Sequence, residues 1–112
     1  MKLNFGFFQK YHIMPNIEEN IEKCKRAVSE KPDDVEALNS LGISYWAAGE
    51  DGAAIEVFTR VVEIDPDLAG AWYNLGCVYK NAGQEEKVKE IFSELENLDA
   101  GLAEEFSTEV MK

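Results

Sequence analysis

The chain has 112 residues, a formal net charge of −11 and a hydrophobic fraction of 46%. This length and composition favour a single folded domain and argue against a disordered chain. No stretch approaches the roughly 20 apolar residues that a membrane-spanning helix needs, so a membrane protein is not expected. The N-terminus lacks a signal-peptide pattern and the two Cys are far apart, which favours a reduced, cytoplasmic setting.

Acidic residues are concentrated in the C-terminal part of the chain. Residues 1–31 carry six Lys/Arg and four Glu, whereas residues 32–112 carry five Lys/Arg and eighteen acids. An acidic surface repels phosphate groups, so neither a nucleic acid nor an anionic membrane is expected as a partner. The charge either keeps the protein in solution or selects basic partners, and composition leaves both interpretations open.

Apolar periodicity, capping residues and turn residues together predict an all-α chain. Asp33 and Asp34 suit the positive end of a helix dipole, and Gly49 suits a helix C-terminus because glycine readily adopts positive φ. The short turns favour antiparallel neighbours. The expected helices cover residues 3–13, 17–31, 35–48, 53–64, 68–82, 84–98 and 101–111.

A repeat of 34 residues organises the middle of the chain. The residues related by this step are Leu38 and Trp72, Leu41 and Leu75, Gly42 and Gly76, Tyr45 and Tyr79, Gly49 and Gly83, Ala54 and Val88, and Phe58 and Phe92. A constant period predicts a solenoid of stacked helix pairs. Gly42 and Gly76 are expected to let paired helices approach closely, and Phe58 and Phe92 are expected to bury their rings between repeats.

These residues resemble the tetratricopeptide repeat family, whose pattern is Trp, Leu-Gly, Tyr, Ala, Phe and Pro over one period. The departures are Leu38 in place of Trp, Val88 in place of Ala and Ala100 in place of Pro. The resemblance implies a right-handed α-solenoid of antiparallel helix pairs, with about six to seven helices. The expected units are a degenerate repeat at 1–34, repeats at 35–68 and 69–102, and a capping helix at 103–112.

The resemblance also implies a non-enzymatic adaptor or scaffold that binds a peptide or helix in a concave groove lined by the first helix of each pair. The candidate groove residues are Asn39, Ile43, Trp46, Tyr73, Asn74, Cys77, Lys80 and Asn81. Trp46 and Tyr73 stand out because large aromatic residues are enriched at binding hot spots. For each of them, packing in the core is the alternative interpretation.

The expected groove is neutral and aromatic, with Lys80 as its one cation, and suits an apolar segment with basic flanks. Some members of the family clamp the terminal carboxylate of a chaperone peptide with Lys, Arg and Asn. Only Asn74 matches that clamp, so a chaperone tail is not expected.

No motif for catalysis, a cofactor or a metal ion is found in the sequence. His12 is the only histidine, and metal sites and catalytic triads need partners at suitable spacing. Cys24 is expected to be a small buried hydrophobic residue. Cys77 is interpreted either as a structural thiol or as a reactive one.

The N-terminal segment is rich in aromatic residues, namely Phe5, Phe7, Phe8 and Tyr11. One interpretation is a first helix that covers the helix at 17–31. The other is a detachable segment that docks on a partner or on a second copy, which would make the protein a self-associating assembly component.

Overall fold

The structure is a computed structural model that describes residues 15–112, and these residues form six α-helices. The helices are α2 (Pro15–Glu30), α3 (Val35–Ala47), α4 (Asp51–Ile64), α5 (Ala69–Asn81), α6 (Glu85–Leu98) and α7 (Ala100–Glu109). The all-α class is confirmed, and the last six expected helices are found with no end shifted by more than two residues. The helix expected over residues 3–13, and His12 with it, lies outside the described residues.

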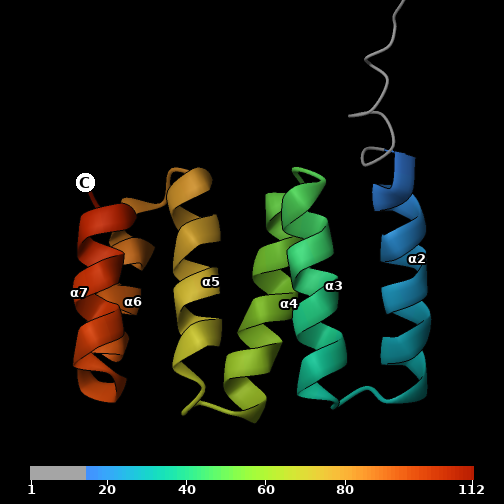
Figure 1. Ribbon diagram of the computed structural model, residues 1–112, viewed down its shortest axis with the longest axis horizontal. Helices are drawn as coiled ribbons and strands as arrows, with labels where there is room; N and C mark the ends of the chain where they lie inside the picture. The colour runs from blue at the N-terminus through green and yellow to red at the C-terminus, as the bar shows by residue number, and fades with distance from the viewer. Residues whose placement is uncertain (1–14) are drawn as a thin grey trace, which may run out of the picture.

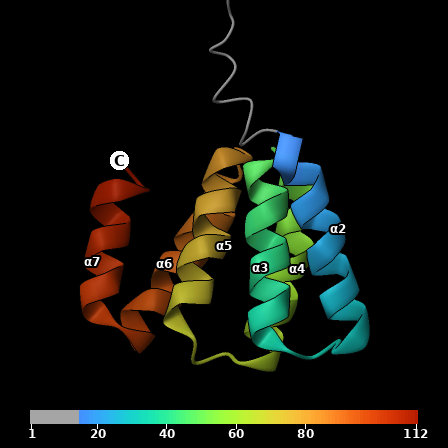
Figure 2. The same ribbon diagram turned by 45° about the vertical axis from the view of Figure 1, so that its right-hand side comes forward.

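Successive helices pack against one another along the chain, from α2 on α3 to α6 on α7. Figure 1 shows α3, α5 and α7 in front, with α4 and α6 behind them. Figure 2 shows α2 and α7 at the two ends of the row. The first helices of successive pairs therefore share one face of a solenoid, and the second helices lie on the other.

Local sequence signals set where the helices begin and end. The carboxylate of Asp34 accepts the backbone N–H of Glu36 at 3.0 Å, which caps α3. Asp99 caps α7 through its side chain in the same way. Gly49 and Gly83 follow α3 and α5 with φ of 79° and 78°, a conformation that glycine adopts at little cost. These caps keep each helix short and let the next one return beside it.

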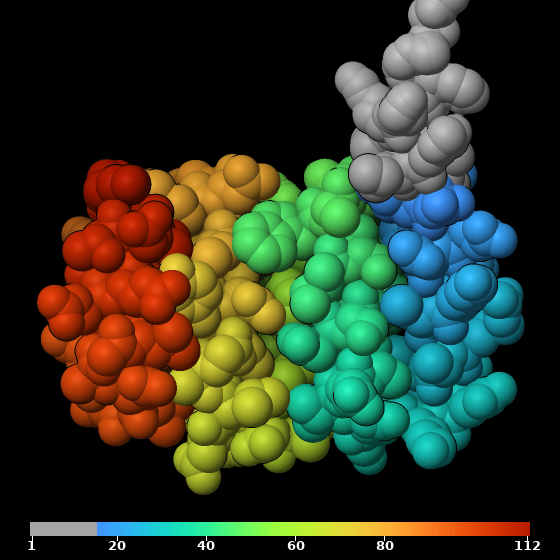
Figure 3. Space-filling view, in the orientation of Figure 1, coloured from blue at the N-terminus to red at the C-terminus, as the bar shows by residue number. Residues whose placement is uncertain are grey.

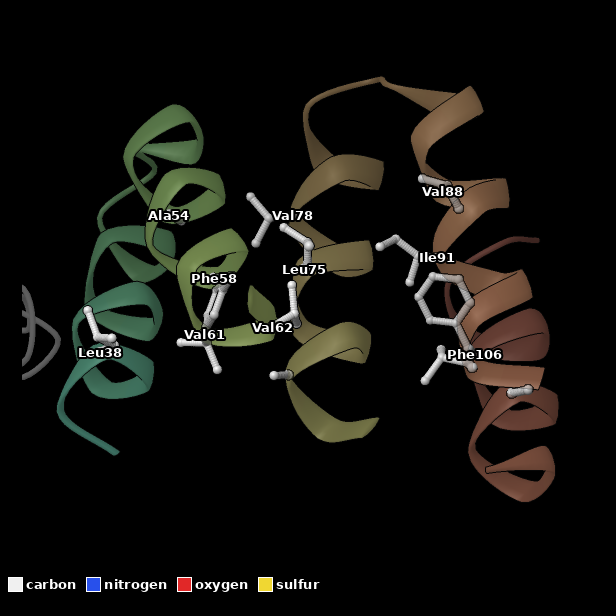
Figure 4. Close-up of a cluster of buried hydrophobic side chains, with 13 residues drawn as sticks. Leu38, Ala54, Phe58, Val61, Val62, Leu75, Val78, Val88, Ile91 and Phe106 are labelled. Atoms are coloured by element: carbon white, nitrogen blue, oxygen red, sulfur yellow. The ribbon is translucent and has the colours of Figure 1, made fainter. Parts of the chain in front are cut away.

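One continuous hydrophobic core joins α3 to α7 (Figure 4). Its buried members are Leu38, Ala54, Phe58, Val61, Val62, Ala71, Leu75, Val78, Val88, Ile91, Leu95, Ala103 and Phe106. They come from every helix of this part of the chain, and neighbouring helices share them. No pair of helices could bury its apolar face without the next pair, as expected for a repeat protein.

The two repeat glycines lie against large buried rings. A Cβ atom built on Gly42 would come within 2.7 Å of the Phe58 ring, and one built on Gly76 would come within 2.5 Å of the Phe106 ring. Both rings are completely buried. The prediction that these glycines allow close helix packing is confirmed.

The ring against Gly76 is not the one that the repeat predicts. Phe92, the equivalent of Phe58, packs against the core but is only half-buried, so the expectation that it buries its ring between repeats holds only in part. Phe106 of α7 fills that space instead. Cys24 also departs from expectation: it is half-buried, with Sγ 3.8 Å from Ser44 Oγ, because α2 packs mainly on α3 among the described helices.

Candidate functional site

The face formed by α3, α5 and α7 holds a cavity of about 370 Å³, here called the front cavity. This face is turned toward the viewer in Figure 3. The residues that line the front cavity are Asn39, Leu68, Gly70, Ala71, Tyr73, Asn74, Leu102 and Glu105. The cavity lies where three first helices converge, because the repeat places successive first helices side by side.

Three of the predicted groove residues meet in the front cavity: Asn39 from α3, and Tyr73 and Asn74 from α5. The Oδ1 atom of Asn39 is buried, and no atom of residues 15–112 forms a hydrogen bond with it. Buried polar atoms are nearly always paired in folded proteins, because an unpaired one costs about 1–3 kcal/mol. The Asn39 amide oxygen is therefore an acceptor without a partner among these residues, on a side chain that lines the cavity.

Tyr73 joins the cavity to the core. Its ring meets the buried Phe106 ring edge to face, with centroids 5.3 Å apart and an interplanar angle of 78°. Burial raises the pKa of the Tyr73 hydroxyl, and electrostatic interactions with Cys77, Glu105 and Glu109 raise it further. The hydroxyl thus stays protonated at neutral pH and can donate a hydrogen bond. Tyr73 thus packs against the core and also lines the front cavity.

The other aromatic candidate lies elsewhere. Trp46 is half-buried and packs against the hydrophobic core, and it does not line the front cavity. Ile43 remains 46% exposed on α3, also outside the cavity lining. Trp46 therefore contributes to packing, whereas Ile43 is a surface residue beside the site.

Lys80 and Asn81 make contacts between helices. Lys80 Nζ lies 3.2 Å from a carboxylate oxygen of Glu85, at the start of α6. Asn81 Nδ2 donates to the Asp51 carboxylate, at the start of α4, with its shorter contact at 3.0 Å. Neither residue lines the front cavity, so the expectation of Lys80 as the one cation of the groove does not match this cavity.

Cys77 is half-buried on α5 beside the site. Burial raises the pKa of its thiol to about 11. The thiol is therefore protonated at neutral pH, and this protonation argues against the interpretation of a reactive cysteine.

Five lining residues are absent from the candidate groove set: Gly70, and the two pairs Leu68 with Leu102 and Ala71 with Glu105. The repeat itself carries a signal for the two pairs, since Leu68 and Leu102 are one period apart, as are Ala71 and Glu105. Leu102 and Glu105 were overlooked because α7 was treated as a cap. In the structure, α7 also forms one wall of the cavity.

The described part of the chain shows neither a metal centre nor a membrane span. Within residues 15–112, no three His, Cys, Asp or Glu side chains are grouped so that they could hold a metal ion. Among the same residues, no helix has the length and apolar character needed to cross a membrane.

Comparisons with known proteins agree with this architecture. Two family profiles match the chain, one described as TPR repeat at residues 45–83 and one described as tetratricopeptide repeat at residues 69–101. No curated protein matches the chain in sequence.

Solved structures of MamA are similar to the chain. One has a TM-score of 0.73 and 27% identity, and the match covers 83% of this chain and 54% of that one. A second has a TM-score of 0.71 and 26% identity, covering 89% and 60%. The chain thus spans little more than half the length of these structures.

Proposed function

Because the chain belongs to the tetratricopeptide repeat family, whose members are protein-interaction modules, we propose that it is a non-enzymatic adaptor that binds a partner segment in the front cavity. The observation that carries this proposal is the convergence of Asn39, Tyr73 and Asn74 on one cavity, with the Asn39 amide oxygen unpaired.

An extended peptide offers the hydrogen-bond partner that the Asn39 amide oxygen lacks. Each peptide unit carries one N–H donor and one C=O acceptor, so a backbone that passes through the cavity pairs with the amide in either of its orientations. Asn74 provides a second amide on the next first helix. Two amides on adjacent helices suit a linear chain better than a compact small molecule.

The rest of the lining describes the side chains of such a segment. Leu68 is 36% exposed and Leu102 is half-buried, so both offer apolar surface to a side chain that enters the cavity. Glu105 is the charged residue of the lining, and it favours a Lys or Arg beside the apolar side chain. The volume of about 370 Å³ lies within the range of roughly 300–1,000 Å³ typical of binding pockets.

The proposal can be tested with peptides selected on the wild-type chain from a randomised library. We expect Asn39→Ala and Asn74→Ala each to weaken the binding of a selected peptide about tenfold, since a lost hydrogen bond costs about 1.4 kcal/mol. Asn97→Ala makes the same chemical change at an exposed position of α6 and should leave the affinity unchanged. Thermal melts show whether each variant is folded. Equal affinities of the wild type and all three folded variants would contradict the proposal.

A further inference from the structure

A second cavity, of about 340 Å³, opens between α4 and α6, with α5 as its floor; it is here called the rear cavity. The residues that line it are Thr59, Val62, Glu63, Trp72, Leu75, Tyr79, Lys87, Glu90, Ile91 and Glu94. It shares no lining residue with the front cavity, because it uses the opposite side of α5 and the second helix of each pair.

The floor of the rear cavity is apolar and fixed in place. Val62, Leu75 and Ile91 are buried members of the core, and Figure 4 shows them on three successive helices. Trp72 and Tyr79 are half-buried. The Trp72 indole N–H donates to the carbonyl oxygen of Pro66 at 2.7 Å, which holds the ring against the loop before α5. The polar atom of the indole is thus satisfied, and its carbon atoms remain available to an apolar ligand.

Trp72 is unusual among the residues at its position of the repeat. Leu38, one period earlier, is 2% exposed, and Phe106, one period later, is completely buried. Trp72 is only half-buried, although it is the largest of the three. A large aromatic residue left partly open in a cleft is typical of a protein-binding hot spot.

The rim of the rear cavity is acidic. Glu63, Glu90 and Glu94 are exposed on it, and Lys87 is its one cation. Lys87 Nζ lies 3.7 Å from the Glu90 carboxylate. Among residues 15–112, neither Glu63 nor Glu94 has an ion-pair partner. The rim therefore carries two carboxylates that no basic group of the described chain neutralises.

This charge pattern belongs to one repeat and is not shared by the other. One period earlier, Ser29 and Arg60 stand at the positions of Glu63 and Glu94. Arg60 is paired with Asp33 at 2.8 Å. The equivalent surface between α2 and α4 thus lacks a carboxylate at both of these positions, so this part of the acidic rim does not follow from the fold alone.

We propose that the rear cavity binds a basic amphipathic segment of a partner protein. An apolar side chain of that segment packs on Trp72 and Tyr79, while Lys or Arg side chains on either side pair with Glu63 and Glu94. The apolar floor and the acidic rim each select one feature of this partner. Since the front and rear cavities do not overlap, one chain can hold two partners at once and bridge them.

A synthetic peptide of leucine and lysine in amphipathic helical spacing serves as the probe. Trp46→Phe leaves Trp72 as the one tryptophan, so its fluorescence reports on the rear cavity. We expect a saturable blue shift with this peptide and none with a peptide in which glutamate replaces lysine. In the wild type, the indole N–H resonance of Trp72 provides the same readout without the Phe substitution.

The decisive comparison uses two double variants with the same change in charge. Glu63→Lys/Glu94→Lys should weaken binding of the leucine–lysine peptide at least about tenfold at low salt. Glu56→Lys/Glu96→Lys changes exposed residues of the same two helices outside the cavity, and it should have an effect within about twofold. Equal weakening by both double variants would show attraction by bulk charge and overturn the proposal. Absence of saturable binding to the wild type would overturn it as well.

Discussion

Phe106 of α7 lies directly against Gly76 of α5, so closely that a Cβ atom on Gly76 would come 2.5 Å from a ring carbon. The same ring supports Tyr73 in the front cavity through an edge-to-face contact. The last helix therefore closes the core and also positions a residue of the candidate binding site. Stability and binding are coupled at this point of the molecule.

Gly76→Ala should destabilise the protein. The new methyl group would overlap the rings and methyl groups of Phe106 and Ile91, which are buried and cannot easily move aside. Overpacking of this kind costs about 1–3 kcal/mol, and better helix propensity returns up to about 1 kcal/mol. Urea unfolding should show a net loss in the free energy of unfolding. Gly52→Ala, which has open space around it in α4, is the matched control and should be neutral or slightly stabilising.

Replacing each of three phenylalanines by alanine should lower the free energy of unfolding by different amounts. Phe58→Ala and Phe106→Ala should each lower the free energy of unfolding by about 3–5 kcal/mol, because both rings are completely buried. Phe92→Ala should cost clearly less, since that ring is half-buried. If Phe92→Ala were as damaging as Phe58→Ala in urea titrations, the assignment of Phe106 to the space against Gly76 would be wrong.

Cys77 should resist alkylation at pH 8. Burial raises the pKa of its thiol from 9.0 to about 11, so the thiolate fraction there is about a hundredfold lower than that of an unshifted thiol. The rate of Cys77 alkylation should rise about tenfold per pH unit until the pH approaches this pKa. A Cys24→Ser variant leaves Cys77 as the one thiol for iodoacetamide labelling. A rate at pH 8 that equals the rate of a small free thiol would contradict the burial.

The raised pKa of the Cys77 thiol also makes the stability of the protein depend on pH. The raised pKa favours the neutral thiol in the folded state, so its stabilising contribution is complete below pH 9 and is lost as the pH rises toward about 11. Cys77→Ser should remove this dependence. The difference in unfolding free energy between the two proteins, followed by urea titration, should therefore change between pH 9 and 11 and stay constant below pH 9.

The adaptor account predicts that the chain is monomeric, with a mass of 12.6 kDa at all concentrations. Sedimentation of the full chain and of a variant that lacks residues 1–14 tests this directly. A mass that increases with concentration in the full chain and returns to that of a monomer in the shortened one would favour self-association through Phe5, Phe7, Phe8 and Tyr11.

The repeat made most of the fold predictable from the sequence. A glycine or proline two residues after the ends of α2, α3, α4 and α5, together with a strict period, defines these helices, since such signals act within a few residues. The positions of Gly42 and Phe58 followed from the same period. Contacts between segments that are far apart in the sequence could not be predicted from the period. An ion pair one turn apart could be expected between Glu56 and Arg60, whereas Arg60 pairs with Asp33 in the loop between α2 and α3.

The candidate site was predictable in part. The resemblance to the repeat family implied that Asn39, Tyr73 and Asn74 share one face, and they line one cavity. It could not show that Lys80 and Asn81 lie outside this cavity, because their side chains contact neighbouring helices instead. Positions one period apart share a face of the solenoid, but the choice between contact and exposure depends on which side chains the neighbouring helix presents.

The most direct test of the central claim is the side-chain amide spectrum of ¹⁵N-labelled protein during titration with a peptide selected on the wild-type chain. The account predicts that the Asn39 and Asn74 amide resonances shift with the same saturation curve, while that of the exposed Asn97 on α6 does not move. Shifts that leave Asn39 and Asn74 unchanged would place the bound peptide elsewhere on the molecule and contradict a binding function of the front cavity.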